Sequence, residues 1–272
     1  MPQKKFYRSR AHCNPLSHND AFDYPIEPSA FDWTVDHYPN HPDLSKNKVI
    51  QPDVLDVGCG FGGLTIQLST LLPQNTILGI EIRAKVCEYV RLRIVALRKE
   101  NQSSTQQQQQ QYENASVMRS NAMKYLPHYF RPNSISKLFF CFPDPHFKEK
   151  NHRRRIISER LLSEYIYLLK PTHGRLYCVT DVEELHLWHV KKCNAHPLLR
   201  KLSDEEMKED VCVETMRMVT EEGKKVERAG AGKYYAVYER IGVKEGAVHA
   251  KNFFNEGEFG VVRSNNKKDG GD

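Results

Sequence analysis

The stretch VLDVGCGFGG, residues 54–63, decides the fold class of this chain. It begins as a short apolar strand and passes through a run of glycines into a helical pattern. Gly58, Gly60 and Gly63 have the G-x-G-x-x-G spacing, which lets the backbone approach a ligand at the N-terminus of the helix. A second apolar strand ends in Glu81, about 20 residues further on, where a carboxylate is placed to bind a ribose diol. The order of these parts predicts a nucleoside-binding α/β unit.

The alternation of strands and helices continues along the chain. Short apolar strands are predicted near 115–118 and over 138–142 and 174–180, with helices between them. A last strand is predicted over 234–238, as an antiparallel partner that finishes the sheet. We therefore predict an α/β fold with a doubly wound, mostly parallel sheet and an antiparallel last strand.

Composition divides the chain into one domain with extensions. Residues 1–47 form a basic N-terminal arm with little periodicity, and 48–242 carry the strand and helix patterns. Within this domain, the glutamine-rich stretch at about 101–112 cannot bury itself and is expected to be a disordered insertion. Residues 243–272 are rich in Gly, Asn, Lys and Glu and are expected to form a flexible tail.

Charge, cysteine content and hydropathy narrow the classes of function. The net charge of +6 favours acidic partners. The seven cysteines include no CxxC pair and follow no signal peptide, so they are expected to be reduced thiols of a cytosolic or nuclear protein. The longest apolar runs are strand-sized, so we expect a soluble protein without a membrane segment. His186 and His189 lack a third ligand, so they are expected on a helix surface and no metal site is predicted.

A second stretch, KLFFCFPDPHFKEKNHRRR at residues 137–155, carries the candidate chemistry. Asp144 lies between two prolines directly after an apolar strand, and the fixed φ of proline makes a stiff turn there. The cations that follow are Lys148, Lys150, Arg153, Arg154 and Arg155. One acid beside a cationic cluster indicates a phosphate-rich substrate.

The N-terminal arm carries a smaller group of cations, Lys4, Lys5, Arg8 and Arg10. Charged termini are often solvated tails without a function. The rings of Phe6 and Tyr7 support a second interpretation, in which cations track phosphates while rings stack on bases. Both interpretations stay open from the residues alone.

The acids around the glycine turn indicate the cofactor. A dinucleotide and S-adenosylmethionine would both place a ribose against Glu81. Asp56 precedes the first glycine, where its carboxylate is placed to reach the cationic amino group of a methionine moiety. Arg83 keeps a nicotinamide dinucleotide as an alternative. After the third strand, Asn121 is placed to contact an adenine through its side-chain amide, with the backbone of Ala122 beside it. Methyl transfer is the favoured interpretation.

Six motifs in order resemble the tRNA (guanine-N7)-methyltransferases of the class I, S-adenosylmethionine-dependent fold, which implies a seven-stranded, Rossmann-like sheet. They are RSRAHCNP from Arg8, DVGCGFGG from Asp56, GIEIR from Gly79, SNAM from Ser120, FPDPHFK from Phe142 and TEEGKK from Thr220. The resemblance covers roughly residues 4–240, apart from the glutamine-rich stretch. Together with the FPDPHFK block, the order of the motifs makes it specific.

The resemblance implies an activity and a set of residues. The activity is methyl transfer from S-adenosylmethionine to N7 of a guanine in the variable loop of tRNA, which forms 7-methylguanosine. Asp144 matches the catalytic acid. The positions around the cofactor are Gly58, Glu81, Ile82, Arg83, Asn121, Ala122 and Cys141, and a loop with Thr220 and Glu222 closes over the site. The resemblance also implies a WD-repeat β-propeller partner that helps to hold the tRNA, and a location in the nucleus.

The chemistry of guanine assigns Asp144 a role other than that of a general base. N7 already carries an available lone pair, so no proton has to be removed before attack. We expect the fixed carboxylate of Asp144 to stabilise the positive charge that enters the ring and to accept hydrogen bonds from guanine N1 and N2. The alternatives are another S-adenosylmethionine-dependent RNA methyltransferase, an NAD-dependent oxidoreductase that uses the glycine turn, and a non-catalytic RNA-binding protein.

Overall fold

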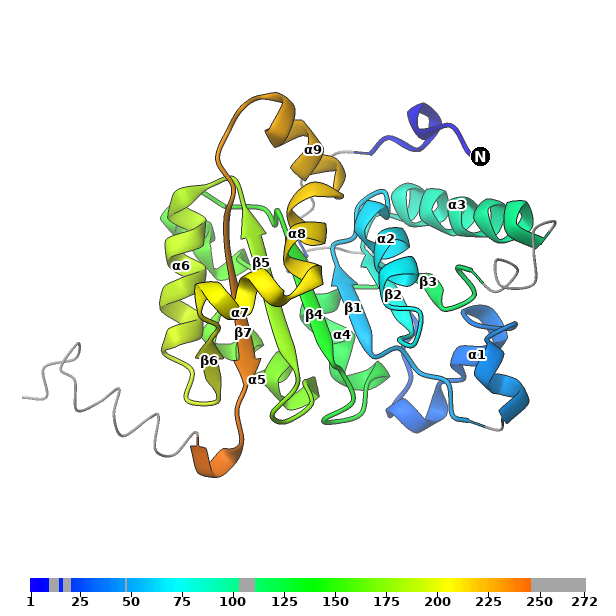
Figure 1. Ribbon diagram of the computed structural model, residues 1–272, viewed down its shortest axis with the longest axis horizontal. Helices are drawn as coiled ribbons and strands as arrows, with labels where there is room; N and C mark the ends of the chain where they lie inside the picture. The colour runs from blue at the N-terminus through cyan, green and yellow to red at the C-terminus, as the bar shows by residue number, and fades with distance from the viewer. Residues whose placement is uncertain (10–14, 17–20, 47, 103–110, 246–272) are drawn as a thin grey trace, which may run out of the picture.

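The computed structural model describes all residues except 10–14, 17–20, 47, 103–110 and 246–272. Within the described part of the chain, seven strands form a single sheet (Figure 1). The strands are β1 (Val54–Val57), β2 (Ile77–Glu81), β3 (Ala115–Arg119), β4 (Lys137–Cys141), β5 (Arg175–Thr180), β6 (Leu199–Lys201) and β7 (Tyr234–Arg240). Their order across the sheet is β3-β2-β1-β4-β5-β7-β6.

The strand directions confirm the predicted fold class. β1 pairs in parallel with β2 and β4, and the parallel set continues to β3 and β5. β7 is antiparallel to β5 and β6, as expected for the last strand. The three-residue β6 was not among the predicted strands, because so short a segment shows no alternation that could be recognised.

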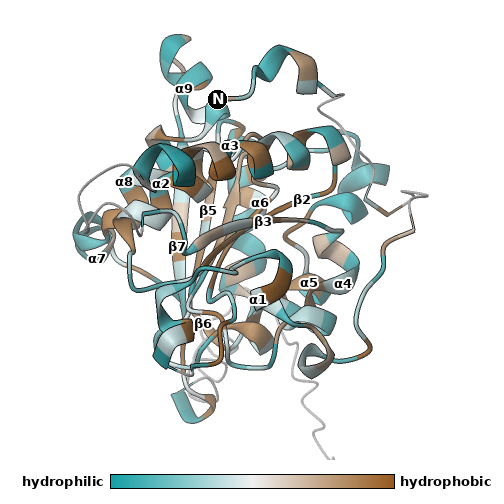
Figure 2. Ribbon diagram, turned by 90° about the vertical axis from the view of Figure 1, so that its right-hand side faces the viewer, coloured by the Kyte–Doolittle hydropathy of each residue, from teal (hydrophilic) through white to brown (hydrophobic). Residues whose placement is uncertain are grey.

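Helices cover both faces of the sheet (Figures 1 and 2). The α-helices of the described chain are α1 (Trp33–Asp36), α2 (Gly63–Leu71), α3 (Ala84–Gln102), α4 (Ala122–Tyr129), α5 (Glu159–Leu168), α6 (Glu183–Asn194), α7 (Asp204–Glu209), α8 (Val211–Met218) and α9 (Glu221–Arg228). Short 3-10 turns are η1 (Lys4–Tyr7), η2 (Pro28–Ala30), η3 (Pro42–Lys46) and η4 (Glu149–Arg154). In Figure 2, α2, α7 and α8 lie on one side of the strands, and α4 and α5 lie on the other.

The strands β1, β2 and the middle of β4 are buried on both faces, which explains their nearly continuous apolar sequences. Successive side chains of a strand point to opposite faces. Phe139 of β4 packs in a cluster with Leu64 of α2 and with α7 and α8. Its neighbours Leu138 and Phe140 pack in a larger cluster with α4, α5 and α6. The two layers of helices therefore pack on the middle of β4 from both sides.

Part of the N-terminal arm contributes to the same core. Trp33 and Tyr38 are 4% and 0% exposed. The ring of Trp33 stacks on that of Phe130, with 5.4 Å between the centroids. The hydroxyl of Tyr38 donates a hydrogen bond of 2.8 Å to the carbonyl of Ile77. The segment around α1 is therefore packed against residues 48–242 and is not a solvated tail.

Two of the predicted extensions lie largely outside the described residues. The glutamine-rich insertion expected at about 101–112 falls mostly on residues 103–110, and the tail expected over 243–272 falls mostly on 246–272. Up to its border with the insertion, α3 stays helical as far as Gln102. No helix among the described residues is long and apolar enough to cross a membrane.

We expect Gly79→Ala to destabilise the protein by about 1–3 kcal/mol, because an added methyl group overpacks the sheet. A Cβ at Gly79 would lie 2.8 Å from Thr65 Oγ1 and 2.9 Å from Cys59 Sγ. Urea denaturation measures the change in the free energy of unfolding. Gly232→Ala is the matched control, since nothing lies within 4 Å of a Cβ there. Equal stability of the two variants would show that the sheet accommodates the methyl group.

Candidate active site

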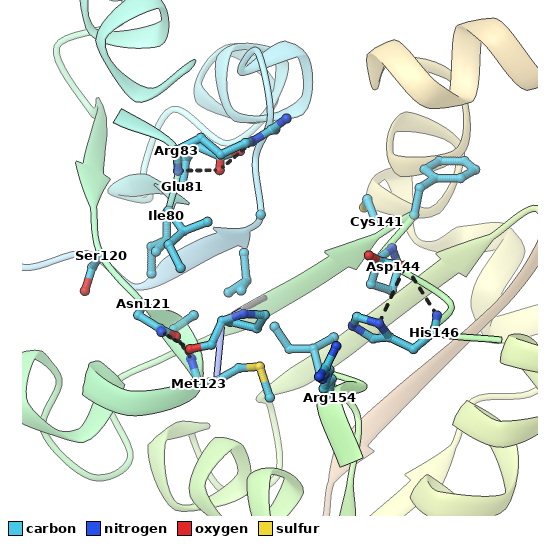
Figure 3. A pocket seen from close by; sticks show the side chains of 18 residues that line it. Ile80, Glu81, Arg83, Ser120, Asn121, Met123, Cys141, Asp144, His146 and Arg154 are labelled. Atoms are coloured by element: carbon cyan, nitrogen blue, oxygen red, sulfur yellow. Dashed lines mark hydrogen bonds and ion pairs between the residues drawn. The ribbon is translucent and has the colours of Figure 1, made fainter. Parts of the chain in front are cut away.

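The strand order places a crevice at the carboxyl ends of β1 and β4. The chain passes from β1 outward to β2 and β3 and then returns to β4 on the other side of β1. Open α/β sheets bind ligands at such a switch point. A cavity of about 220 Å³ lies there (Figure 3). It is lined by Pro15, Val57, Gly58, Ile80, Glu81, Ile82, Arg83, Ser120, Asn121, Ala122, Met123, Cys141, Phe142, Pro143, Asp144, His146, Arg154 and Ile156.

The glycine turn after β1 needs glycine for its backbone conformation. Gly58 and Gly60 have φ angles of 74° and 55°, in the left-handed region that other residues rarely adopt. The amide of Gly58 donates to the carbonyl of Ile80, which ties the turn to β2. Gly58 lines the cavity as predicted, whereas Gly60 does not. The assignment of Gly60 to cofactor binding stays a prediction, and nothing lies within 4 Å of a Cβ added there.

Asp56 lies behind the cavity wall and does not line it. Its side chain is buried, and one carboxylate oxygen accepts a hydrogen bond of 2.7 Å from Thr65 Oγ1 on α2. Burial raises the pKa of Asp56 to about 7, with a further contribution from the negative charges of Glu221 and Glu81. Through this hydrogen bond Asp56 fixes α2 against β1. Its direct contact with a methionine amino group stays a prediction.

Glu81, Ile82 and Arg83 line the cavity at the end of β2, as predicted. The carboxylate of Glu81 accepts hydrogen bonds from the backbone amide, Nε and Nη2 of Arg83, at 2.9, 3.0 and 2.8 Å. This bidentate pair is mostly shielded, since the Glu81 side chain is 4% exposed. Arg83 therefore holds the carboxylate in one orientation at the edge of the cavity (Figure 3).

Asn121 and Ala122 also line the cavity, but the side chain of Asn121 already has partners. Its Oδ1 accepts from the amide of Met123 and caps α4, and its Nδ2 donates to the carbonyl of Pro15 at 2.6 Å. Each end of the amide keeps capacity for a further hydrogen bond, so the contact of Asn121 with an adenine stays a prediction. The backbone of Ala122 remains part of the wall.

Asp144 lies in a tight turn at the end of β4 and faces the cavity. The flanking residues Phe142 and His146 have φ angles of 51° and 45°, which are uncommon outside glycine. The carboxylate of Asp144 accepts from the amide of His146 at 3.3 Å, and its side chain is 30% exposed. Figure 3 places Asp144 across the cavity from Glu81, with Cys141 beside it. Cys141 and Asp144 line the cavity as predicted.

The cations after Asp144 divide into three groups. Lys148, Lys150 and Arg153 are exposed, which fits the predicted contact with RNA. Arg154 lines the cavity. Arg155 is 1% exposed, so its assignment to RNA binding is wrong. The sequence places the five in one cluster, but the turn of η4 points consecutive side chains in different directions.

The cations of the N-terminal arm also differ from one another. Lys5 and Arg8 are exposed, whereas Arg10 lies outside the described residues. Lys4 pairs with Glu221 at 3.4 Å and lies 4.2 Å above the ring of Phe61 in the glycine turn. The arm is therefore docked beside the site through Lys4.

The predicted loop over the site does not line the cavity. The hydroxyl of Thr220 accepts from the amide of Gly223 at 2.8 Å and so caps α9. Glu222 pairs with Lys225 at 2.8 Å on an exposed face. Both residues serve the first turn of α9 in this structure, and their assignment to cofactor binding stays a prediction. Their neighbour Glu221 is the acid that faces the glycine turn, within 3.7 Å of Arg93.

Comparisons with known proteins decide the family. The profile of the family described as "Putative methyltransferase" matches residues 50–236. The tRNA (guanine-N(7)-)-methyltransferase of Eremothecium gossypii is 48% identical over 242 residues, which are 89% of this chain and 83% of that protein. The proteins of the same name from Schizosaccharomyces pombe and Arabidopsis thaliana are 46% and 47% identical over 89% of this chain, and the matches cover 86% and 92% of those proteins. The chain belongs to this methyltransferase family.

In this methyltransferase, several residues of the cavity lie in the quoted motifs, but the sequence assigned them no role. Pro15 reaches the wall from more than a hundred positions away and is held by Asn121. Ser120, Met123 and His146 border predicted residues, and only their packing shows that they share the wall. His189, expected on a helix surface, is 1% exposed, and burial lowers its pKa to about 3. Among the described residues, no group of three or more His, Cys, Asp or Glu could hold a metal ion.

We expect Asp56→Asn to remove a pH dependence of stability in this methyltransferase. The pKa of Asp56 is raised from 3.8 to about 7, so the folded state keeps a proton that the unfolded chain has released. Stability from this residue is therefore complete below the ordinary pKa and is lost as the pH rises to about 7. Asparagine does not ionise. The free energy of unfolding of the variant, relative to that of the parent, should therefore rise by about 2 kcal/mol between pH 5 and pH 8.

Urea denaturation at several pH values in this range gives the two free energies of unfolding. Thr65→Val, which removes the hydrogen bond to Asp56 but leaves the carboxyl group, should keep the pH dependence. A difference between Asp56→Asn and the parent that is constant with pH would contradict the raised pKa.

Proposed function

We infer that the chain transfers the methyl group of S-adenosylmethionine to N7 of a guanine in tRNA. Family membership over 89% of the chain is the observation that carries this function. S-adenosylmethionine supplies an electrophilic methyl group on a positively charged sulfur. The alternative of an NAD-dependent oxidoreductase rests on the glycine turn alone, which many nucleoside-binding folds share.

The cavity supports a methyl donor that contains a nucleoside. Gly58 and the backbone of Ala122 leave room for close approach of a ligand to the main chain, and Glu81 is held as a ribose acceptor. The side chains of Val57 and Ile80 add apolar surface to the wall of the cavity. Asp144 lies at the far end, where a base can enter from solvent because the side chain is partly exposed.

We propose that Asp144 positions the guanine and stabilises the charge that forms on it. The turn holds the carboxylate at the mouth of the cavity, beside Cys141 and within reach of a purine edge. As an ionised acceptor it would bind guanine N1 and N2, which are both donors. A preorganised carboxylate also stabilises the positive charge that enters the imidazole ring during transfer.

We expect Asp144→Ala to lower the single-turnover rate of tRNA methylation by about 100-fold or more, the usual effect of removing one preorganised electrostatic group. Methylation with a radiolabelled methyl donor measures the rate, and calorimetry with S-adenosylhomocysteine measures cofactor affinity, which should stay within about twofold. Glu205→Ala, which removes an exposed acid on α7, is the control. A rate near that of the parent would refute this role, and loss of cofactor binding would assign Asp144 to the cofactor site.

The exposed cations near the cavity support a tRNA-binding surface that ends at Asp144. Lys148, Lys150 and Arg153 project from η4 and the residue before it, and Arg154 borders the cavity. Lys5 and Arg8 of the arm are also exposed. Phosphate contacts from such groups orient a nucleic acid without reading its sequence.

We expect the triple variant Lys148→Ala, Lys150→Ala, Arg153→Ala to bind tRNA more weakly and with less salt dependence. Each lost phosphate contact reduces the slope of log K against log salt by about 0.7 to 0.9, so the slope should fall by about 2 to 3. Filter binding between low and moderate salt measures it. Lys208→Ala, an exposed cation on α7, should leave the slope unchanged. An unaltered slope in the triple variant would place the tRNA elsewhere.

We also propose the finer features that the family resemblance implies: a guanine in the variable loop as the target, a WD-repeat β-propeller partner and a nuclear location. Mass spectrometry of tRNA digests can locate the methylated guanine. Co-purification of the tagged chain with a propeller protein from nuclear and cytoplasmic fractions tests the other two. A fully active chain recovered alone from the cytoplasm would contradict both.

A further inference from the structure

Arg155 is the largest fully buried side chain of the protein's described part, and it carries a charge. Taking a guanidinium group out of water is unfavourable unless hydrogen bonds and an opposite charge compensate. Its Nη2 donates to Glu184 Oε1 at 2.6 Å, and the Glu184 side chain is 55% exposed. A surface ion pair of this kind does not require the cation to be buried, so the position of Arg155 needs another reason.

The second polar contact of Arg155 reaches the turn that holds Asp144. Its Nε donates a hydrogen bond of 2.9 Å to the carbonyl of Pro145, the residue that follows Asp144. The same turn has non-glycine residues with positive φ on both sides, Phe142 and His146. Such conformations are strained in residues other than glycine and persist only where surrounding contacts hold them. Arg155 supplies one of these contacts from outside the turn.

Arg155 is itself fixed to α6 and to the start of α5. Its guanidinium carbon lies 4.7 Å from the centroid of the Trp188 ring. The ring nitrogen of Trp188 donates to the carbonyl of Ile157 at 2.7 Å, and the ring of His152 meets Trp188 edge-on at 5.3 Å. Glu184 and Trp188 both belong to α6, so α6 holds the guanidinium by charge and by its aromatic face.

We infer that Arg155 is a positioning residue for Asp144, and that Glu184 and Trp188 hold it in place. This inference rests on the proposed role of Asp144. The hydrogen bond to Pro145 fixes the direction in which the turn presents the carboxylate to the cavity. Because Arg155 directly follows η4, the same buried group also anchors the segment that carries the exposed Lys150 and Arg153. Arg155 therefore holds both the carboxylate of Asp144 and the cationic segment of the tRNA-binding surface in place.

Arg155→Lys tests the inference, because lysine keeps the positive charge but loses the planar group that bonds Pro145 and Glu184 together. We expect the single-turnover methylation rate to fall by about tenfold or more, since small errors in the position of a reacting group are costly to rate. The affinity for S-adenosylhomocysteine should stay within about twofold, and saturating tRNA keeps any change in tRNA affinity out of the measured rate. Arg160→Lys, an exposed arginine on α5, is the matched control and should keep the parent rate.

A double-mutant cycle with Asp144→Ala separates positioning from a general loss of structure. If Arg155 acts through Asp144, adding Arg155→Lys to Asp144→Ala should cause no further loss of rate. If the fold-losses of rate in the two single variants multiply in the double variant, the inference is overturned. A methylation rate equal to that of the parent in Arg155→Lys alone would also overturn it. The methylation rate of the single variant Asp144→Ala tests the proposed role of Asp144 by itself, whatever the rate of Arg155→Lys is.

Glu184→Ala provides a second variant if Arg155→Lys does not fold. Glu184 is mostly exposed, so its truncation should leave the midpoint of thermal unfolding nearly unchanged. Because the guanidinium of Arg155 then lacks its acidic partner, we expect the single-turnover rate to fall several-fold. The affinity for S-adenosylhomocysteine should not change. Restoration of the rate in Glu184→Gln, which keeps an acceptor for Nη2, supports positioning. A parent rate in Glu184→Ala would overturn it.

Discussion

The parallel pairing of β1 with β4 is the constraint on which the rest of the structure depends. Its register sets Val57 beside Phe140, so the glycine turn and the segment of Cys141 leave the sheet next to each other. The segments that follow β1 and β4 then diverge in opposite directions, because β2 and β5 lie on opposite sides of the pair. The cavity is the space between these diverging turns. Helices on both faces bury β1 and the middle of β4, which keeps the register of the pair fixed.

Both turns at the cavity hold unusual backbone conformations, and they do so by different means. The turn after β1 uses glycine, for which a positive φ is not strained. The turn after β4 has Phe142 and His146 in the same region and relies on contacts from outside, among them the hydrogen bond from Arg155. The first turn is therefore encoded locally. The second depends on the packing of α6 against the domain.

Charges of opposite sign are separated around the site. The acid Glu81 is buried beside the cavity and Glu221 lies next to the glycine turn, whereas burial raises the pKa of Asp56 to about 7 and keeps it protonated below that pH. The exposed cations of η4 lie outside, on the side of Asp144. A positively charged methyl donor is favoured by the first group and a polyanionic RNA by the second. This arrangement explains how a chain with a modest net charge of +6 can serve two ligands of opposite charge.

The sequence alone determined the order of the strands other than β6, the glycine turn, and the acids at the ends of β2 and β4. These features are local: apolar runs, glycine spacing and proline positions act within a few residues. Only the tertiary structure decided which predicted residues share the cavity. Pro15 joins it and Thr220 does not, because both outcomes depend on packing between distant segments. Arg155 shows the same limit most clearly, since five cations look alike in the chain and only burial against Trp188 makes one of them structural.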